Sequence, residues 1–134
     1  MRVLVLLRGD EASEAGELPS HDIVDQMMKF NADLAEAGVL LLAEGLRPSS
    51  DGARTSHVDG KKTVVDGPFA EAKEVVVGFW VWDVANMDEA KQWALRCPAE
   101  LEIRPVFETA DFGDHLTEEQ RALDEQIRSG LGDS

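Results

Sequence analysis

The chain of 134 residues has little sulfur, few aromatic side chains and little positive charge. Its one cysteine, Cys97, cannot form an intramolecular disulfide, and this low thiol count is typical of a reducing compartment. Only 13 basic side chains stand against 27 acidic ones, for a net charge of -14. Such a chain lacks the basic surface that binds phosphate backbones or anionic lipid, so we expect no nucleic-acid partner and no membrane partner.

Long hydrophobic runs are also missing. No apolar stretch reaches the roughly 20 residues that a membrane-spanning helix needs, and the apolar start of the chain, interrupted by Arg8 and Asp10, is too short for a secretory signal. We therefore expect a cytoplasmic protein.

Sequence motifs for common cofactors and metals are absent as well. The chain has no Gly-x-Gly-x-x-Gly, no Walker-type lysine loop and no Gly-x-Ser-x-Gly elbow, which disfavours nucleotide-dependent and serine-hydrolase chemistry. It has no His-x-x-x-His, Cys-x-x-Cys or Glu-x-x-His spacing. We expect no cofactor and no metal site.

The chain does have enough apolar residues, 43%, to bury a core, and their spacing predicts a series of strands and helices. Ser20 and Asn86 are suitable helix N-caps, and Asp59-Gly60 between β-prone runs predicts a hairpin. In chain order we expect a buried strand at 2–8, a helix at 21–37, a second buried strand from Val39 to Pro48, a hairpin at 53–65, a strand at 74–82, a helix from Asn86 to Cys97, a strand at 101–108 and a helix after Thr117.

This order predicts an α+β fold, a ferredoxin-like split βαβ sheet with an inserted β-hairpin. We divide the chain into a domain at 1–108 and an acidic, helical C-terminal extension at 109–134. The strand at 74–82 is apolar on both of its faces, whereas helices should cover only one face of the sheet. We therefore predict a homodimer in which the two open sheet faces pack together.

The segment from Asp66 to Glu74, DGPFAEAKE, is the most distinctive motif. Gly67 and Pro68 are typical turn residues, and Phe69 should anchor the turn in the core. The motif resembles the signature of the DGPF branch of the YCII-related domain family. The resemblance extends over about residues 1–108, through LLRGDE, AEGLRPS, RCP and EIRPVFE.

That resemblance implies a ferredoxin-like fold and a dimeric α/β barrel. Some relatives are linked to sigma factors of the extracytoplasmic-function class. In the wider superfamily a His-Asp pair has been proposed as catalytic, and one relative is a dehydrochlorinase of a chlorinated hydroquinone. The superfamily's helix histidine falls near Met27, whose thioether cannot transfer a proton, so this mechanism does not carry over.

Three residues are candidates for acid-base chemistry: Asp66, Lys73 and Glu44. Asp66 and Lys73 can equally be solvated charges of the turn. Glu44 interrupts an apolar strand, where a carboxylate must be paired, protonated or in a wet cavity. An ion pair between Glu44 and Arg104 across the sheet is the structural alternative.

Four further residues are candidates for substrate binding: Phe69, Arg104, Trp80 and His57. His57 lies on the predicted hairpin, where a surface position is the more common role. The chain could be a cofactor-independent enzyme or binder of a small, aromatic compound, and the sequence leaves open whether it is an enzyme at all. The alternative is a non-catalytic regulatory module with an acidic surface for a basic protein. A pocket of roughly 300 Å³ or more containing Asp66 or Glu44 would favour the first.

Overall fold

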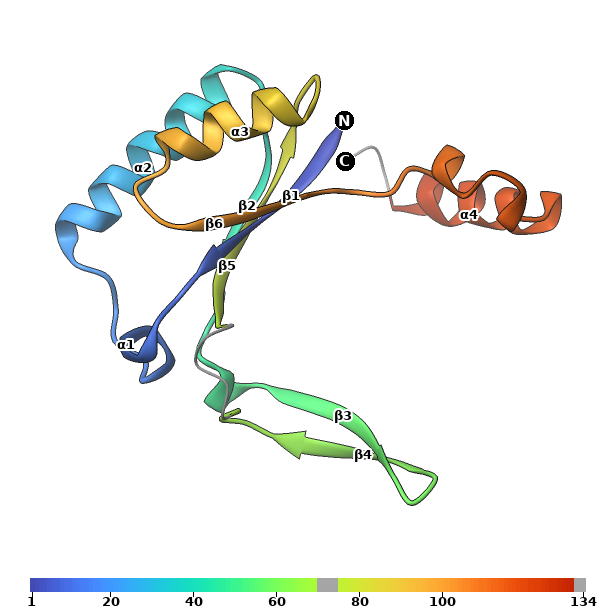
Figure 1. Cartoon of the computed structure of the whole chain (residues 1–134), viewed down its shortest axis with the longest axis horizontal. Helices are drawn as coiled ribbons and strands as arrows, with labels where there is room; N and C mark the ends of the chain where they lie inside the picture. Colours follow the sequence, from blue (N-terminus) through green and yellow to red (C-terminus); the bar gives the residue numbers. More distant parts are fainter. Residues whose placement is uncertain (70–74, 132–134) are drawn as a thin grey trace.

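The structure is a computed structural model, and it describes residues 1–69 and 75–131. It is a mixed α+β fold with antiparallel sheets (Figure 1). The strands are β1 (Arg2–Arg8), β2 (Leu40–Gly45), β3 (Ala53–Val58), β4 (Lys61–Asp66), β5 (Val76–Asp83) and β6 (Leu101–Pro105). The helices are α1 (Glu11–Glu14), α2 (His21–Glu36), α3 (Met87–Arg96) and α4 (Glu118–Gly130), with 3-10 turns at Ser49–Asp51 and Thr109–His115.

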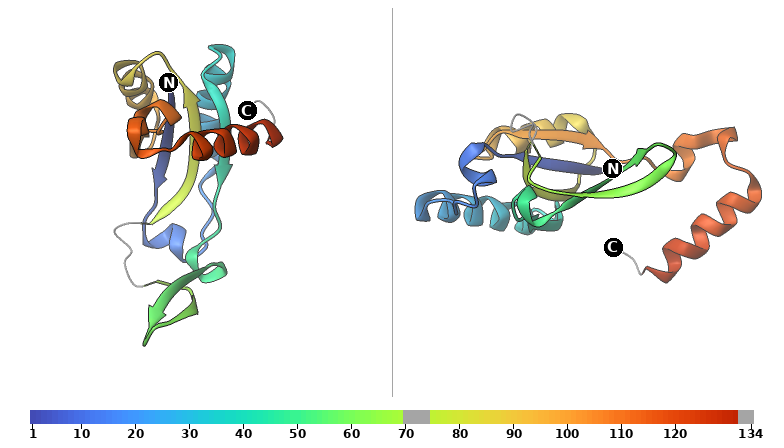
Figure 2. Two further views of the ribbon diagram at one scale, coloured as in Figure 1. Left: turned by 90° about the vertical axis from the view of Figure 1, so that its right-hand side faces the viewer. Right: turned by 90° about the horizontal axis from the view of Figure 1, so that it is seen from below.

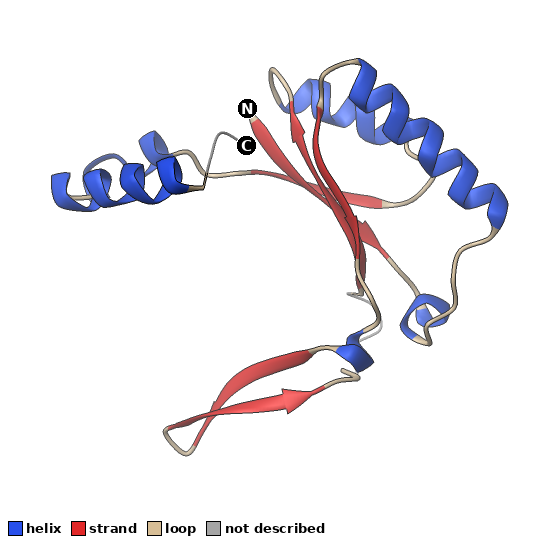
Figure 3. Ribbon diagram, turned by 180° about the vertical axis from the view of Figure 1, so that it is seen from behind, coloured by secondary structure: helices blue, strands red, loops and turns tan. Residues whose placement is uncertain are grey.

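The main sheet has four strands in the order β2-β5-β1-β6, and all neighbouring strands are antiparallel. Helices α2 and α3 cover one face of this sheet (Figure 3). The helix ends follow the predicted caps, since Ser20 Oγ accepts the Ile23 N–H at 3.3 Å and Asn86 Oδ1 accepts the Glu89 N–H at 2.9 Å. Gly38 follows α2 with a positive φ of 74°, which glycine adopts without strain.

Three local expectations need correction. The four-residue helix α1 lies where a loop was expected, because Asp10 and Ser13 cap each other's backbone N–H groups. Strand β6 ends at Pro105, short of the expected 108. Strand β2 is an edge strand, not a fully buried one, and Leu41 and Leu42 are about two-fifths exposed (44% and 43%).

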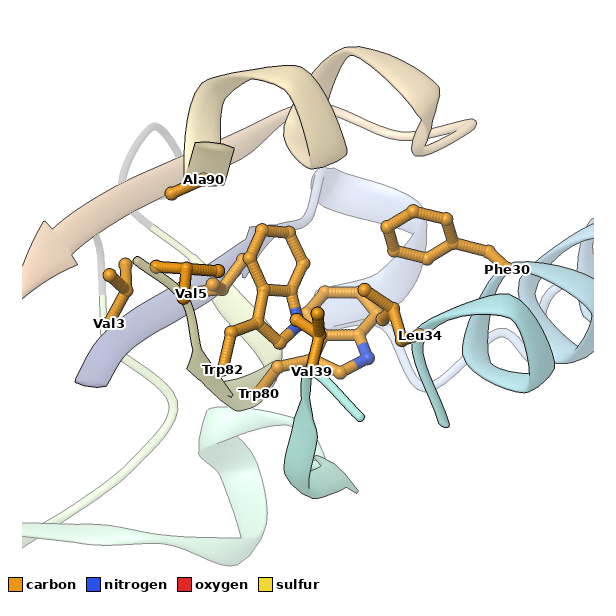
Figure 4. Close-up of a cluster of buried hydrophobic side chains, with 9 residues drawn as sticks. Val3, Val5, Phe30, Leu34, Val39, Trp80, Trp82 and Ala90 are labelled. Atoms are coloured by element: carbon orange, nitrogen blue, oxygen red, sulfur yellow. The ribbon is translucent and has the colours of Figure 1, made fainter. Parts of the chain in front are cut away.

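The core lies between α2, α3 and the covered sheet face (Figure 4). Trp80 and Trp82 project from β5 against Phe30 of α2, with both ring centroids 6.0 Å from the Phe30 ring in edge-on contacts. The buried members of the core are Val3, Val5, Phe30, Leu34, Val39, Trp80, Trp82, Val84 and Ala90. Because side chains along β5 point alternately to the two faces of the sheet, both tryptophans lie on the face that the helices cover.

The opposite face of the main sheet is open, and it carries the alternate side chains of the same strands. Phe79 and Val81 of β5 pair with Leu6 and Leu4 of β1, and Val81 also pairs with Leu42 of β2. The β3-β4 sheet and α4 both extend outward on this side, which leaves the open face between two projecting arms (Figures 1 and 3). Helix α4 crosses in front of this face in the left view of Figure 2 but stands away from the sheet in Figure 1, so among the described residues no helix packs on it.

The strands expected at 53–65 form a separate two-stranded sheet, with Ala53 opposite Asp66 and Val58 opposite Lys61. Asp59 and Gly60 in the connecting turn both have positive φ, 51° and 77°, as the tight hairpin turn requires. Apart from Thr63, the residues of β3 and β4 are exposed. Two strands alone are marginally stable in water, so this arm depends on contacts at its root.

Candidate functional site

The first candidate site is a hollow beneath α2, here called the α2 hollow. Its volume is about 200 Å³, and Gly78 lies in its wall. A Cβ atom at Gly78 would lie 3.0 Å from the Glu44 carbonyl oxygen and 3.5 Å from Leu7 Cδ2, so glycine at this position allows β2 to approach β5 closely. The lining residues are Leu7, Met27, Asn31, Ala43, Glu44, Gly45, Gly78, Phe79 and Trp80.

Two residues with polar side chains line the α2 hollow. Asn31 of α2 accepts the indole N–H of Trp80 through Oδ1 at 2.7 Å, which fixes the orientation of both side chains. Glu44 is exposed, and it pairs in register with Phe79 on the open side of the sheet. Its side chain therefore leaves β2 on the face opposite α2, while Ala43 and Trp80 form the wall of the hollow beneath α2.

The ion pair between Glu44 and Arg104, the structural alternative named above, does not form. These residues lie on β2 and β6, the two opposite edges of the main sheet, with β5 and β1 between them. Three strand spacings amount to about 14 Å. The two residues also occupy different rows, since Glu44 lies level with Phe79 and Leu6, whereas Arg104 lies level with Leu4.

The second candidate site is a pocket where the β3-β4 arm leaves the main sheet, here called the hairpin-root pocket. Its volume is about 230 Å³. The guanidinium of Arg54 lies over the Phe69 ring, 4.0 Å from its centroid. The lining residues are Glu14, Leu46, Arg47, Ser49, Arg54, Phe69, Val75 and Val76. The pocket shares none of its lining residues with the α2 hollow.

A clamp of hydrogen bonds holds this pocket together. Glu14 accepts the Ser49 N–H through Oε1 at 2.7 Å and the Ser49 hydroxyl through Oε2, and these bonds lower the pKa of the Glu14 carboxyl. Ser49 Oγ in turn accepts the Phe69 N–H at 3.2 Å. A Cβ atom at Gly67 would overlap the Ser49 carbonyl, so the turn before Phe69 fits against this segment only with glycine.

The predicted site residues do not gather in one place within a single chain. Glu44 and Trp80 line the α2 hollow, and Phe69 lines the hairpin-root pocket. Asp66 and His57 are exposed on the hairpin arm and line neither, while Arg104 is exposed on β6. Lys73 lies outside the described residues. The single cleft expected to contain Asp66 and Glu44 is therefore not formed within the described part of one chain.

Sequence reasoning missed Glu14, Ser49 and Asn31. Glu14 and Ser49 lie 35 positions apart in segments interpreted as loops, and only the folded chain brings them together. The helical spacing of α2 offered one signal for Asn31, because it lies four positions after Met27 and so on the same side of the helix.

In residues 1–69 and 75–131, no group of three or more His, Cys, Asp or Glu side chains lies close enough to hold a metal ion. Within the same ranges, no helix combines the length and the apolar character needed to cross a bilayer. Cys97 follows α3, and burial raises the pKa of its thiol, which makes it a poor nucleophile near neutral pH.

Comparison with known proteins places the chain among relatives whose function is largely open. It is 33% identical over 96 residues to the uncharacterized protein R00369 of Rhizobium meliloti (strain 1021), a match that covers 70% of this chain and 77% of that protein. Among solved structures it resembles 5-chloro-2-hydroxyhydroquinone dehydrochlorinase from Burkholderia phenoliruptrix AC1100 in complex with 2,5-dihydroxybenzoquinone. That likeness has a TM-score of 0.40 and 11% identity, and it covers 87% of this chain and all of that one. The model of the YCII-related domain matches residues 1–110, and the chain therefore belongs to the YCII-related domain family.

Proposed function

We propose that this protein is a cofactor-independent small-molecule binding protein of the DGPF branch and that it works as a homodimer. The observation that carries the proposal is the α2 hollow, a cavity of about 200 Å³ lined by residues of α2, β1, β2 and β5. This volume is below the roughly 300 Å³ expected above of a ligand pocket, so the hollow suits only a molecule the size of a single ring.

The walls of the α2 hollow define the ligand's chemistry. Leu7, Met27 and Trp80 are apolar or aromatic, which favours an uncharged aromatic ring. Asn31 uses its Oδ1 atom for Trp80, while its Nδ2 group makes no hydrogen bond with the described residues. That group can donate to a hydroxyl or carbonyl oxygen on the ring. The ligand we propose is therefore a small phenol, quinol or quinone.

Glu44 is the one ionisable residue among the described residues that line the α2 hollow. Its carboxylate leaves β2 on the open face of the sheet, so it could act only on a ligand that reaches this edge. Met27 lies on α2 where the wider superfamily has a histidine, and a thioether neither takes nor gives a proton. We therefore propose binding as the primary activity, with Glu44 as the candidate acid or base for any turnover.

The homodimer follows from the open face of the sheet. The strand order β2-β5-β1-β6, with α2 and α3 on one face, supports a ferredoxin-like arrangement. The other face presents Leu4, Leu42, Phe79 and Val81 without a covering helix, and a second copy related by a two-fold axis would bury this face against its own, as in a dimeric α/β barrel. Because the Glu44 side chain lies on this side of β2, the partner sheet would lie beside it.

A thermal-shift screen with single-ring phenols, quinols and quinones tests the binding proposal. Ala43→Leu fills the hollow, and Ala53→Leu makes the same change on an exposed position of β3 as a matched control. We expect compounds that raise the melting temperature of the wild type and of Ala53→Leu but not of Ala43→Leu. The proposal is contradicted if no compound acts, or if Ala43→Leu responds like the wild type.

A second candidate function is a non-catalytic regulatory module for sigma factors of the extracytoplasmic-function class. It is favoured by α4 and its C-cap Leu131, because Leu123, Ile127 and Leu131 are 56%, 54% and 76% exposed at helical spacing. The double change Leu123→Glu and Ile127→Glu would remove this apolar stripe. If this alternative holds, the change abolishes co-elution with such a sigma factor, and no ring compound stabilises the wild type.

A further inference from the structure

The hairpin-root pocket is built from parts of the chain that are far apart in sequence. Glu14 comes from α1, Arg54 from β3, Phe69 from the turn after β4, and Val75 and Val76 from the start of β5. The proposed ligand site in the α2 hollow uses none of these residues. An activity of this pocket would therefore be separate from that of the hollow.

Arginines outnumber carboxylates among the described residues of this pocket, although the chain as a whole is strongly acidic. Among the described residues that line it, Arg47 and Arg54 stand beside one carboxylate, Glu14, whereas the whole chain has a net charge of -14. Both carboxylate oxygens of Glu14 accept hydrogen bonds from Ser49. Arg47 is partly offset at the surface by Asp51, whose Oδ2 lies 3.2 Å from Arg47 Nε.

Within the described part of the chain, Arg54 has an aromatic partner and no acidic one. It makes no ion pair with a carboxylate among residues 1–69 and 75–131, and its guanidinium lies over the face of Phe69 at 4.0 Å. Stacking of this kind leaves the N–H groups along the guanidinium edge free to donate. These groups match the two oxygens of a carboxylate, which a guanidinium binds through paired hydrogen bonds.

Hydrogen bonds hold the Phe69 segment on which the Arg54 guanidinium stacks. Phe69 is held through its N–H by Ser49 Oγ, and Ser49 is held by Glu14. The ring that supports the guanidinium is therefore tied to α1 through two successive hydrogen-bonded contacts. A binding group fixed in this way loses less conformational entropy when a ligand arrives.

We propose that the hairpin-root pocket binds a small organic monoanion, a carboxylic acid with a single-ring or short aliphatic body. The carboxylate pairs with the Arg54 guanidinium, and the apolar body lies against Leu46, Val75 and Val76. The Arg54 guanidinium and this apolar wall suit a monoanion better than phosphate or a dicarboxylate. The volume of about 230 Å³ fits a body of this size.

Isothermal titration calorimetry with benzoate and hexanoate tests this proposal. Benzyl alcohol supplies the ring without the charge, and acetate and inorganic phosphate supply charge without the apolar body. We expect benzoate and hexanoate to bind at least about tenfold more tightly than these three, because a charge-assisted hydrogen bond contributes beyond the burial of the body. Raising the salt concentration should weaken their binding, since the carboxylate meets a partly exposed charge.

Three variants complete the experiment. Arg54→Gln should reduce benzoate affinity by about tenfold or more, and Arg54→Lys should restore only part of it, because an ammonium keeps the charge but not the planar pair of donors. Arg128→Gln removes an arginine of α4 as the matched control and should bind like the wild type. Melting curves show whether each variant is folded, and the amide signals of Ser49 and Phe69 in NMR spectra report binding directly in the wild type.

The proposal is overturned if benzyl alcohol binds as tightly as benzoate, if folded Arg54→Gln binds benzoate like the wild type, or if neither acid shifts the Phe69 amide signal. Ala43→Leu separates this result from the first proposal. That change fills the α2 hollow, so it should leave benzoate binding intact even where it abolishes the response to phenols.

Discussion

The indole N–H of Trp80 donates a hydrogen bond of 2.7 Å to Asn31 Oδ1, and this bond joins the central strand β5 to the helix α2 that covers it. Trp80 is only 4% exposed, so its N–H has no ready access to water. The same two side chains line the α2 hollow. One contact therefore contributes to stability and also shapes the proposed ligand site.

Asn31→Ala should lower the free energy of unfolding by about 1–3 kcal/mol, because it leaves the Trp80 N–H buried without an acceptor. Urea denaturation measures the effect. Trp80→Phe made in the Asn31→Ala background removes the orphaned donor, so it should cost less than Trp80→Phe in the wild type. Equal costs in the two backgrounds would show that the hydrogen bond contributes nothing.

Gly67→Ala should destabilise the protein by about 1–3 kcal/mol, since the added methyl group overlaps the Ser49 carbonyl and must displace backbone. Gly52→Ala is the matched control, because a Cβ there lies 3.5 Å from the same Ser49 oxygen, an ordinary contact. Thermal unfolding of the two variants compares them. If both unfold at the same temperature, the close approach of Gly67 to Ser49 does not occur in solution.

The contact between Glu14 and Ser49 should depend on pH. Hydrogen bonds from Ser49 lower the pKa of Glu14 in the folded state below its ordinary value of 4.5. A carboxyl whose pKa is lowered by folding stabilises the protein above its unfolded pKa, and this contribution is lost as the pH falls through the folded pKa. The stability difference between wild type and Glu14→Gln should therefore be constant near pH 7 and shrink below about pH 4.5.

Denaturation of both proteins across this pH range measures that difference. Asp10 and Asp124 also have lowered pKa values, so the wild type alone cannot isolate Glu14, whereas subtraction of the two curves does. A difference that stays the same from pH 7 to pH 3 would rule out an ionised Glu14 as the acceptor.

The proposed homodimer predicts a mass of twice 14.7 kDa by light scattering at micromolar concentration. Leu42→Asp puts a charge on the open sheet face beside Val81 and should yield monomers. Val64→Asp makes a similar change on the hairpin arm, where the side chain is 70% exposed, and should leave the dimer intact. A monomeric wild type would refute the sheet-to-sheet dimer.

Hydrophobic spacing predicted the helices α2, α3 and α4 and the strands of the main sheet because these depend on local patterns. The same reasoning interpreted β2 as a buried strand, since an apolar run such as Leu40–Leu42 looks alike in a central strand and in an edge strand. Only the strand order, which is a long-range property, distinguishes the two.

The candidate sites were less predictable for the same reason. Glu44 and Arg104 looked like partners because each interrupts an apolar strand, but the sheet order puts them at opposite edges. Phe69 was expected to anchor its turn, but its support from Ser49 and Glu14 crosses 20 and then 35 positions of sequence. Local turn chemistry carries no information about such contacts.

Ligand binding in the α2 hollow is tested by a titration with a single-ring phenol. The titration is followed through the indole N–H signals of the three tryptophans in NMR spectra. Trp80 lines the α2 hollow, whereas Trp82 and Trp93 do not. We predict that the Trp80 signal shifts in a saturable way, that the other two change less, and that Ala43→Leu abolishes the shift. Saturable binding that leaves the Trp80 signal unmoved, or no binding by any phenol, quinol or quinone, would contradict the account.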